Sequence, residues 1–265
     1  MDLLKREHAP IPEAAWAFID DTARQVIRTH LTARRFVDVS GPHGLAHAAV
    51  GLGRLDVGEA EGVGYGIHRV LPLVELRARF TLDIWDLDSI LRGARNPEDG
   101  PLIEAARRAA LFEERAVLHG FAPGGIQGLL ESAEREAESL VLEPDPFLDA
   151  ISRSVLDLRH RGVQGPYALV VGPRPFRFLA TFQSGYPLVR QVERLIEGPL
   201  VQSDLLEGGI LVSTRGGDAE LTLGADFAVG YEHHTTKQVH LFVSESLTFR
   251  VLDPTAFVPL KLEGR

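Results

Sequence analysis

Three aspartates surround one of the two tryptophans in the stretch TLDIWDLDSI, residues 81–90. Carboxylates around an aromatic ring suit a metal site, an acid/base pair or a platform for a planar ligand. Asp83 falls on the polar face of a predicted strand, and Asp86 or Asp88 is placed to cap or charge the first turn of a short helix. These structural roles account for the three aspartates without a catalytic or metal-binding function. For Trp85, ligand stacking and simple cover for a helix–sheet corner both stay open.

The other side chains that carry chemistry form no recognised catalytic set. The sequence has no G-x-S-x-G, H-E-x-x-H, G-x-G-x-x-G or Walker A pattern. The adjacent pair His233 and His234 lies in an extended segment, where neighbouring side chains point to opposite faces. We therefore predict no catalytic residue and no metal site.

Composition narrows the classes of protein further. The chain has 265 residues, 45% of them hydrophobic, no cysteine and a formal net charge of −9. Disulfides and thiolate chemistry are excluded, and scattered cations do not favour nucleic acid. No apolar run approaches the roughly 20 residues of a membrane span, and the first residues do not resemble a secretory signal. We expect a cytoplasmic protein without nucleic-acid or membrane partners.

Helices and strands are interleaved along the chain. Apolar spacing predicts helices over residues 13–34, 102–120 and 146–161. Strict alternation predicts a half-buried strand over 76–84, and the run YALVVG predicts a buried one over 167–172. Six glycines within 50–66 indicate a flexible arm or long hairpin, and the last third alternates short strands with turns. The pattern is typical of an α+β protein.

Several separate motifs carry a resemblance to a known family. They run in order over nearly the whole chain: the N-terminal MDLLKREHAPIPEAAWAFIDDTAR, then RRFVDVSGPHG, LPLVELRARFTLDIWDLDSILRG, FEERAVLHG, QGLL, GVQGPYALVV, YPL, RGGDAELTLGADFAVGYE and ESLTFRVLDPTAF. Together they resemble the family 1 encapsulins, the linocin-type shell proteins of nanocompartments.

The resemblance implies the fold of the HK97 phage capsid protein. It implies a peripheral domain with a long spine helix, an axial domain and an extended loop that reaches a neighbouring subunit. The corresponding ranges are 1–49 for the N-terminal helix and start of the peripheral domain, 50–72 for the extended loop, 73–130 for the peripheral domain with the spine helix, 131–219 for the axial domain and 220–265 for the peripheral return.

The resemblance also implies three sites. The first is a groove for the C-terminal targeting peptide of a cargo enzyme, formed by Ile19, Ala23, Ile27, His30, Leu31, Arg34, Asp38, Val229 and Tyr231. The second is the five-fold pore loop, Gln183, Ser184, Gly185, Tyr186 and Pro187. The third is flavin stacking on Trp85 near Arg77. No cofactor is required for the implied function.

The implied function is a non-catalytic, self-assembling icosahedral shell, of the smallest T=1 size. It would enclose a ferritin-like protein or a dye-decolorising peroxidase, with roles in iron storage and oxidative stress. Two alternatives stay open: a phage-type major capsid protein, and a linocin-like peptidase or bacteriocin. The acidic balance and the N-terminal helix favour the shell.

Overall fold

The computed structural model describes residues 3–94, 96–182 and 186–263. The chain forms two compact units. The first unit comprises Met1–Leu31, Ser40–Glu113 and Thr222–Thr248, and the second comprises Thr32–Val39, Glu114–Leu221 and Phe249–Arg265. Helix α3 and strands β1, β9 and β11 each contribute residues to both.

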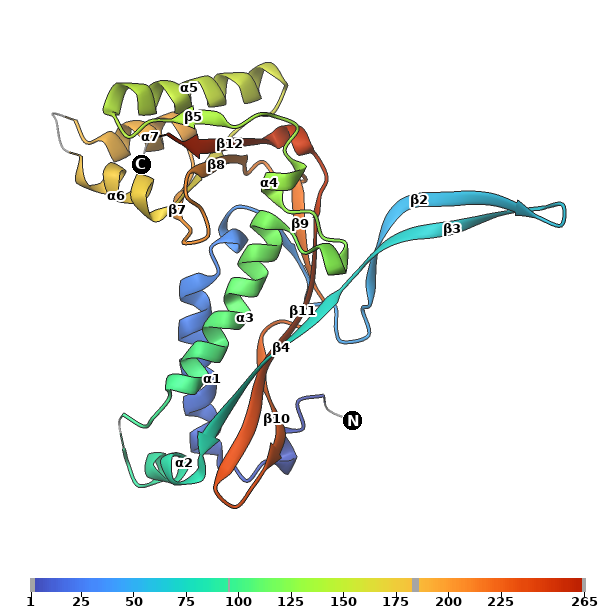
Figure 1. Cartoon of the computed structure of the whole chain (residues 1–265), viewed down its shortest axis with the longest axis vertical. Coiled ribbons are helices and arrows are strands. Elements are labelled where there is room, and N and C mark those ends of the chain that lie inside the picture. Colours follow the sequence, from blue (N-terminus) through green and yellow to red (C-terminus); the bar gives the residue numbers. More distant parts are fainter. Residues whose placement is uncertain (1–2, 95, 183–185, 264–265) are drawn as a thin grey trace. The chain divides into compact units, whose positions relative to one another are not determined.

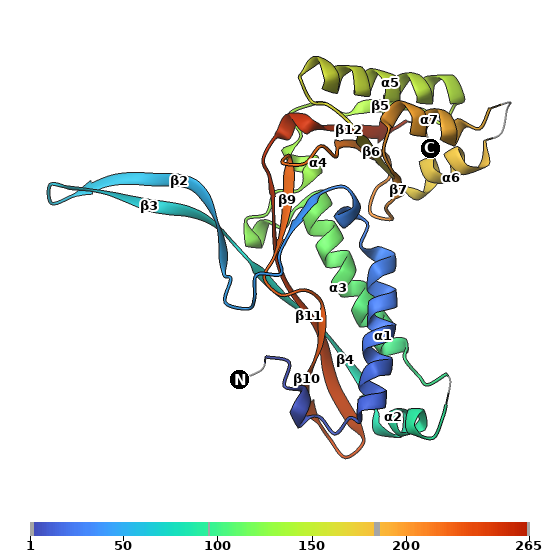
Figure 2. The ribbon, with the colours of Figure 1, turned by 180° about the vertical axis from the view of Figure 1, so that it is seen from behind.

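The first unit contains long helices and long strands. Its elements are η1 (Arg6–His8), α1 (Glu13–His30), β2 (Ala49–Ala60), β3 (Val63–Pro72), β4 (Val74–Asp83), α2 (Ile84–Leu91), α3 (Gly100–His119, to Glu113), β10 (Ala228–His234) and β11 (Gln238–Val251, to Thr248). Figures 1 and 2 show α1 beside α3 along the strands β4, β10 and β11.

Alternating residues build the core of the first unit. Strand β11 pairs antiparallel with both β4 and β10. Val239, Leu241 and Val243 on one face of β11 are buried, as are Leu76, Phe80 and Leu82 of the apolar row that the alternation predicted on β4. Since a strand turns every second side chain to the same face, one face of this sheet is apolar and is covered by helices.

Helix α1 is shorter than the sequence predicted. It ends at His30, not at Arg34, and a separate 3-10 turn, η2 (Ala33–Arg35), follows. The carboxylate of Glu114 accepts hydrogen bonds from the hydroxyl of Thr32 at 2.6 Å and from the backbone N–H of Ala33 at 2.5 Å. A buried acceptor for these donors favours the new turn over continuing the helix.

Helix α2 begins earlier than the sequence predicted. It starts at Ile84, and its N-cap is Asp83, neither Asp86 nor Asp88. The prediction that one of these two caps or charges the first turn holds for the charge, because Asp86 lies in that turn. Asp83 is both the last residue of β4 and the cap, so the helix begins without a connecting loop. Trp85 therefore lies in the first helical turn and is 72% exposed.

The hairpin β2–β3 forms a two-stranded sheet of its own and extends away from the other strands of the first unit (Figures 1 and 2). It covers the range 50–72 that was predicted as the extended loop. Tyr65 lies directly opposite Gly58, and a side chain at position 58 would come within 2.5 Å of its ring. The glycine thus leaves room for the aromatic ring to cover the ribbon.

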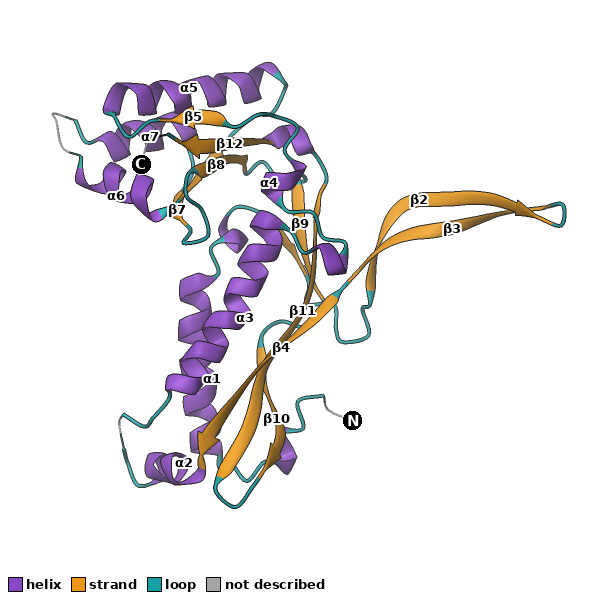
Figure 3. Ribbon diagram, in the orientation of Figure 1, coloured by secondary structure: helices purple, strands orange, loops and turns teal. Residues whose placement is uncertain are grey.

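The second unit is a sheet flanked by helices (Figure 3). Its strands follow the order β5-β12-β8-β6-β7, and β6, the predicted buried strand, is buried at every residue. Phe147, Ile151 and Leu158 of α5 are fully buried. The bounds are η2, β1 (Asp38–Ser40), η3 (Ala122–Gly124), α4 (Leu129–Ser132), β5 (Glu138–Leu140), α5 (Pro144–His160), β6 (Tyr167–Val171), α6 (Pro173–Thr181), α7 (Leu188–Ile196), β7 (Leu200–Gln202), β8 (Gly209–Ser213), β9 (Ala219–Leu223), η4 (Pro254–Ala256) and β12 (Phe257–Leu262).

The second unit includes more of the chain than residues 131–219, the predicted axial range. Strand β12, near the C-terminus, pairs with β8 antiparallel and with β5 parallel. Its residues Phe257 and Leu260 are buried. This pairing places the end of the chain in the second unit's sheet, a long-range relationship that local sequence patterns do not reveal.

Candidate functional site

Five of the nine residues predicted for the peptide groove are buried in the first unit. Helix α1 packs against β10 and α2, and its Ile19, Ala23 and Ile27 are at most 7% exposed. Val229 and Tyr231 of β10 are also buried. These side chains are core residues of the single chain, because the apolar stripe of α1 is used to cover the sheet. His30 and Leu31 stay half-buried.

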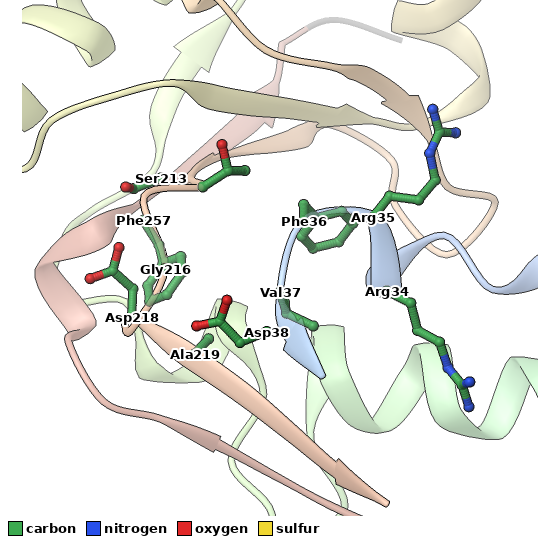
Figure 4. Close-up of a pocket in the computed structure, with 11 residues that line it drawn as sticks. Arg34, Arg35, Phe36, Val37, Asp38, Ser213, Gly216, Asp218, Ala219 and Phe257 are labelled. Carbon is green, nitrogen blue, oxygen red and sulfur yellow. The ribbon is translucent and has the colours of Figure 1, made fainter. Parts of the chain in front are cut away.

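The remaining two residues of the predicted groove line a cavity in the second unit. Arg34 and Asp38 contribute to a cavity of about 130 Å³ together with Phe36, Ser213, Asp218 and Phe257, among others. In Figure 4, the side chains of Arg34 and Arg35 point away from Asp38 and Asp218. The acidic side chains are therefore the charged groups that face this cavity.

A glycine turn holds Asp38 in place. Its carboxylate accepts a hydrogen bond of 2.6 Å from the backbone N–H of Gly217. Gly216 and Gly217 have φ angles of 86° and 82°, a left-handed conformation that glycine adopts without strain. The turn from Arg215 to Asp218 thus presents an N–H group to a carboxylate 179 positions earlier in the chain.

Asp218 differs from Asp38 because it has a cation beside it. Arg215 donates to both oxygens of Asp218, to Asp253 at 2.8 Å and to the carbonyl oxygen of Gly162 at 3.1 Å. The hydrogen bond to Asp218 is the main reason that the pKa of Arg215 lies above its usual value. Asp218 is 4% exposed and Asp38 is exposed. The accessible negative charge in the cavity is therefore that of Asp38.

The sequence singled out Arg34 and Asp38 but not their neighbours in the cavity. Asp218 ends the Arg215–Asp218 turn, and Ser213 lies two residues before this turn. The sequence indicated only that short strands and turns alternate in this part of the chain. The two consecutive glycines of the turn are the signal that a backbone N–H is turned toward something. Phe36 and Phe257 are buried walls with no distinguishing local pattern.

Two of the five residues of the predicted pore loop, Tyr186 and Pro187, belong to the described part of the chain. Gln183, Ser184 and Gly185 lie outside the described residues. Tyr186 is 62% exposed, and its carbonyl oxygen accepts a hydrogen bond from Gln191 at 3.1 Å. Pro187 is the N-cap residue of α7. Tyr186 also lines an open depression of about 700 Å³ with residues of α5 and α7.

Trp85 and Arg77 do not come together within one chain. Arg77 is six residues before Asp83 on β4, which separates it from the start of α2 by about 20 Å. Its guanidinium lies 4.8 Å from the ring centre of Phe242 and bonds to Glu75. The cation beside the exposed Trp85 ring is Arg92, at 5.8 Å.

The described residues contain no group of three or more histidine, cysteine, aspartate or glutamate side chains that could hold a metal ion. Within the same part of the chain, no helix combines the length and apolar character needed to cross a bilayer.

Comparison with known proteins places the chain in a family. Residues 1–248 match the family described as "Encapsulating protein for peroxidase". A type 1 encapsulin shell protein of Rhodospirillum rubrum is 44% identical over 98% of this chain and 97% of its own. That of Mycobacterium tuberculosis is 36% identical over 98% and 99%.

Solved structures show the same fold at low identity. The virus-like particle of Pyrococcus furiosus matches with a TM-score of 0.67 at 14% identity, covering 93% of this chain and 99% of its own. The capsid of the myovirus XM1 matches with a TM-score of 0.58 at 12% identity, covering 86% and 90%. The fold is that of HK97-like capsid proteins, as predicted, and the chain belongs to the encapsulin family of shell proteins that enclose cargo.

Proposed function

We propose that this shell protein holds its cargo through the cavity of Asp38. The supporting observation is an exposed carboxylate, fixed by the Gly217 N–H, at the wall of a cavity with buried phenylalanines. A C-terminal targeting peptide offers what this cavity can bind: backbone N–H groups and a cationic side chain for Asp38, and an aliphatic side chain for the apolar wall. The side chain of Arg34, at the edge of the cavity, points away from Asp38 (Figure 4). We assign it to the outer part of the peptide.

The experiment is co-purification of a tagged cargo. A ferritin-like protein or dye-decolorising peroxidase from the same genome, with its C-terminal tail, is expressed with wild type, Asp38→Ala, Arg34→Ala and the double variant. We expect intact shells with reduced cargo for Asp38→Ala and the double variant. Asp204→Ala, an exposed aspartate elsewhere in the second unit, is the matched control. If shells of the double variant carry as much cargo as wild-type shells, the targeting peptide binds at another site.

The same proposal includes the smallest icosahedral architecture, T=1, as the self-association product. The apolar hairpin β2–β3 supports self-association, since seven of its apolar side chains are more than 40% exposed: Leu52, Leu55, Val57, Val63, Tyr65, Ile67 and Val70. Closed shells result when the rotation between copies closes. Electron microscopy of the chain expressed alone gives the size, and a persistent monomer at micromolar concentration contradicts the proposal.

We further propose that the shell is not an enzyme and resides in the cytoplasm with its cargo. Purified empty shells are expected to leave a peptide substrate mixture intact. Cell fractionation is expected to recover them with cytoplasmic markers. Peptide cleavage that survives repurification would instead support the linocin-like peptidase alternative.

A flavin is a second candidate ligand of the shell. The exposed ring of Trp85 fits a planar ligand, and Arg92 rather than Arg77 lies beside it. A bound flavin would stack on this ring and add its own absorption band to purified shells. The band is expected to disappear in Trp85→Ala and to persist in Arg77→Ala. Shells without the band, even after incubation with riboflavin phosphate, would remove this candidate.

A further inference from the structure

Two histidines stack on each other at the free end of the β10–β11 hairpin. His233 and His240 are directly opposite in the strand register. Their ring centres are 4.1 Å apart, and the ring planes differ by only 9°. His233 is exposed and His240 is half-buried. Parallel rings at this distance place any charge on one ring in contact with the other.

A β-bulge explains why these two side chains share a face. The register shifts between Tyr231 and His233, leaving Glu232 as the extra residue. Tyr231 and His234 then lie together, with the Tyr231 hydroxyl 2.6 Å from Nδ1 of His234. His233 is turned to the opposite face, where it meets His240.

The position of His240 is fixed from its other side. Nδ1 of His240 shares a hydrogen bond of 3.0 Å with the hydroxyl of Thr81, its partner across the β4–β11 ladder. Thr81 can donate to this nitrogen or accept from it, so the bond survives a change of protonation. Its ring therefore stays in place whether or not it is charged, and His233 is the ring that must move.

The surrounding charges do not compensate for two protons. Glu232, the residue before His233, is already paired with Arg79 of β4 at 3.0 Å. Asp83 caps α2. The charged and titratable groups around the pair are Arg79 and Asp83 on β4, Glu232 and His234 on β10, Lys237 in the turn before β11, and Arg6, Glu7 and His8 on η1, which packs against β10. Arg6 is paired with Asp20, and His8 with Glu7.

We propose that His233 and His240 form a proton-sensitive pair that controls how firmly the end of the β10–β11 hairpin is closed. With at most one proton on the two rings, they stay stacked. A second proton puts like charges at the stacking distance, the His233 ring separates, and the hairpin end opens more often. Acidification thus acts on one defined element of the shell protein.

Hydrogen–deuterium exchange of the assembled full-length shell tests this proposal. Exchange of peptides covering 228–241 is measured between pH 7.5 and 5 and corrected for the intrinsic pH dependence of amide exchange. Repulsion between unit charges about 4 Å apart in water is expected to increase hairpin opening about fivefold at the acid end. Peptides from β6, which is buried and remote in sequence, serve as the internal reference.

Two variants distinguish an effect of this histidine pair from a general effect of acid on the protein. His233→Phe keeps a flat ring over His240 but cannot be charged, so the acid-induced opening should be lost. His43→Phe removes one member of a second histidine contact, with His47, whose ring centres are 4.8 Å apart and tilted by 42°. It should leave the hairpin response unchanged. The proposal is overturned if wild type shows no acid-induced opening, or if His233→Phe opens as wild type does.

Discussion

The carboxylate of Asp83 accepts a hydrogen bond of 2.8 Å from the backbone N–H of Trp85. This contact joins the last residue of β4 to the first turn of α2 and fixes where the helix begins. It also assigns a structural role to one of the three aspartates that first suggested a catalytic site.

Removing this cap should loosen α2. Asp83→Ala is expected to lower the stability of the helix by about 1 kcal/mol, because an orphan N–H loses its acceptor. Asp83→Asn retains an acceptor and should stay close to wild type. Exchange protection of peptides covering 84–91 provides the measurement. Asp86→Ala, in the same helical turn, is the control and should change protection by only a few tenths of a kcal/mol. Equal effects at both positions would argue against a specific cap.

A second prediction concerns Gly230 and Phe242, which are opposite each other on β10 and β11. A side chain at position 230 would overlap the ring of Phe242, which is 2% exposed and has little room to move. Gly230→Ala is therefore expected to destabilise the first unit by about 1–3 kcal/mol. Gly64→Ala should have a small effect, because the added methyl group would meet no atom within 4 Å apart from its chain neighbours. Recovery of the unfolding temperature in Gly230→Ala with Phe242→Leu would identify the overlap as the cause.

The third prediction concerns acid stability. Burial raises the pKa of Asp253, but hydrogen bonds from Thr255 and the charge of Arg215 lower it by more, so the net pKa lies below its ordinary 3.8. A lowered carboxylate pKa stabilises the fold fully above the ordinary value, and this stabilisation is lost as pH falls through the folded value. Asp253→Asn should therefore have a lower unfolding temperature than wild type at pH 7. Near pH 3 the unfolding temperatures of the two proteins should lie closer together. Asp204→Asn should show neither effect.

The fourth prediction concerns the hairpin arm. Val57 is 82% exposed and Ile67 is 62% exposed on β2 and β3. Val57→Asp and Ile67→Asp are expected to preserve the fold of the chain but to reduce shell yield, because a charge would be buried in the contact between copies. Glu59→Gln on the same arm should still assemble. Far-ultraviolet circular dichroism reports whether the fold is preserved, and native mass spectrometry reports how much shell forms. Normal shell yield from both Val57→Asp and Ile67→Asp would show that the arm does not take part in assembly.

Local sequence patterns predicted the elements in which buried side chains recur at a regular spacing. The alternation over residues 76–84 predicted β4, which ends at Asp83, because one face of this strand is buried. The apolar run over residues 167–172 predicted β6, which ends at Val171, because both faces are covered. In each case the residue types respond to an environment that repeats along the element itself.

Two of the features that the sequence did not predict depend on distant residues. The end of α1 is followed by a turn whose donors bond to Glu114, 81 positions after Ala33. The cavity depends on the contact between Asp38 and Gly217. The start of α2 was missed for a local reason, since Asp83 fits the strand alternation and the cap equally well. The resemblance to encapsulins assigned Arg34, Asp38, Ile19 and Ile27 to one groove. The burial of Ile19 and Ile27 is decided by the packing of α1, which the resemblance does not describe.

The exposed hairpin β2–β3 has a consequence for the life of the chain before assembly. A newly made subunit carries a two-stranded ribbon with uncovered apolar side chains, the kind of surface that promotes aggregation. In the proposed shell this arm is covered by a neighbouring copy, so we expect closure to remove the apolar surface from water. The ratio of shells to aggregates should then depend on the rate of synthesis. Slow expression is expected to favour assembly of shells over aggregation.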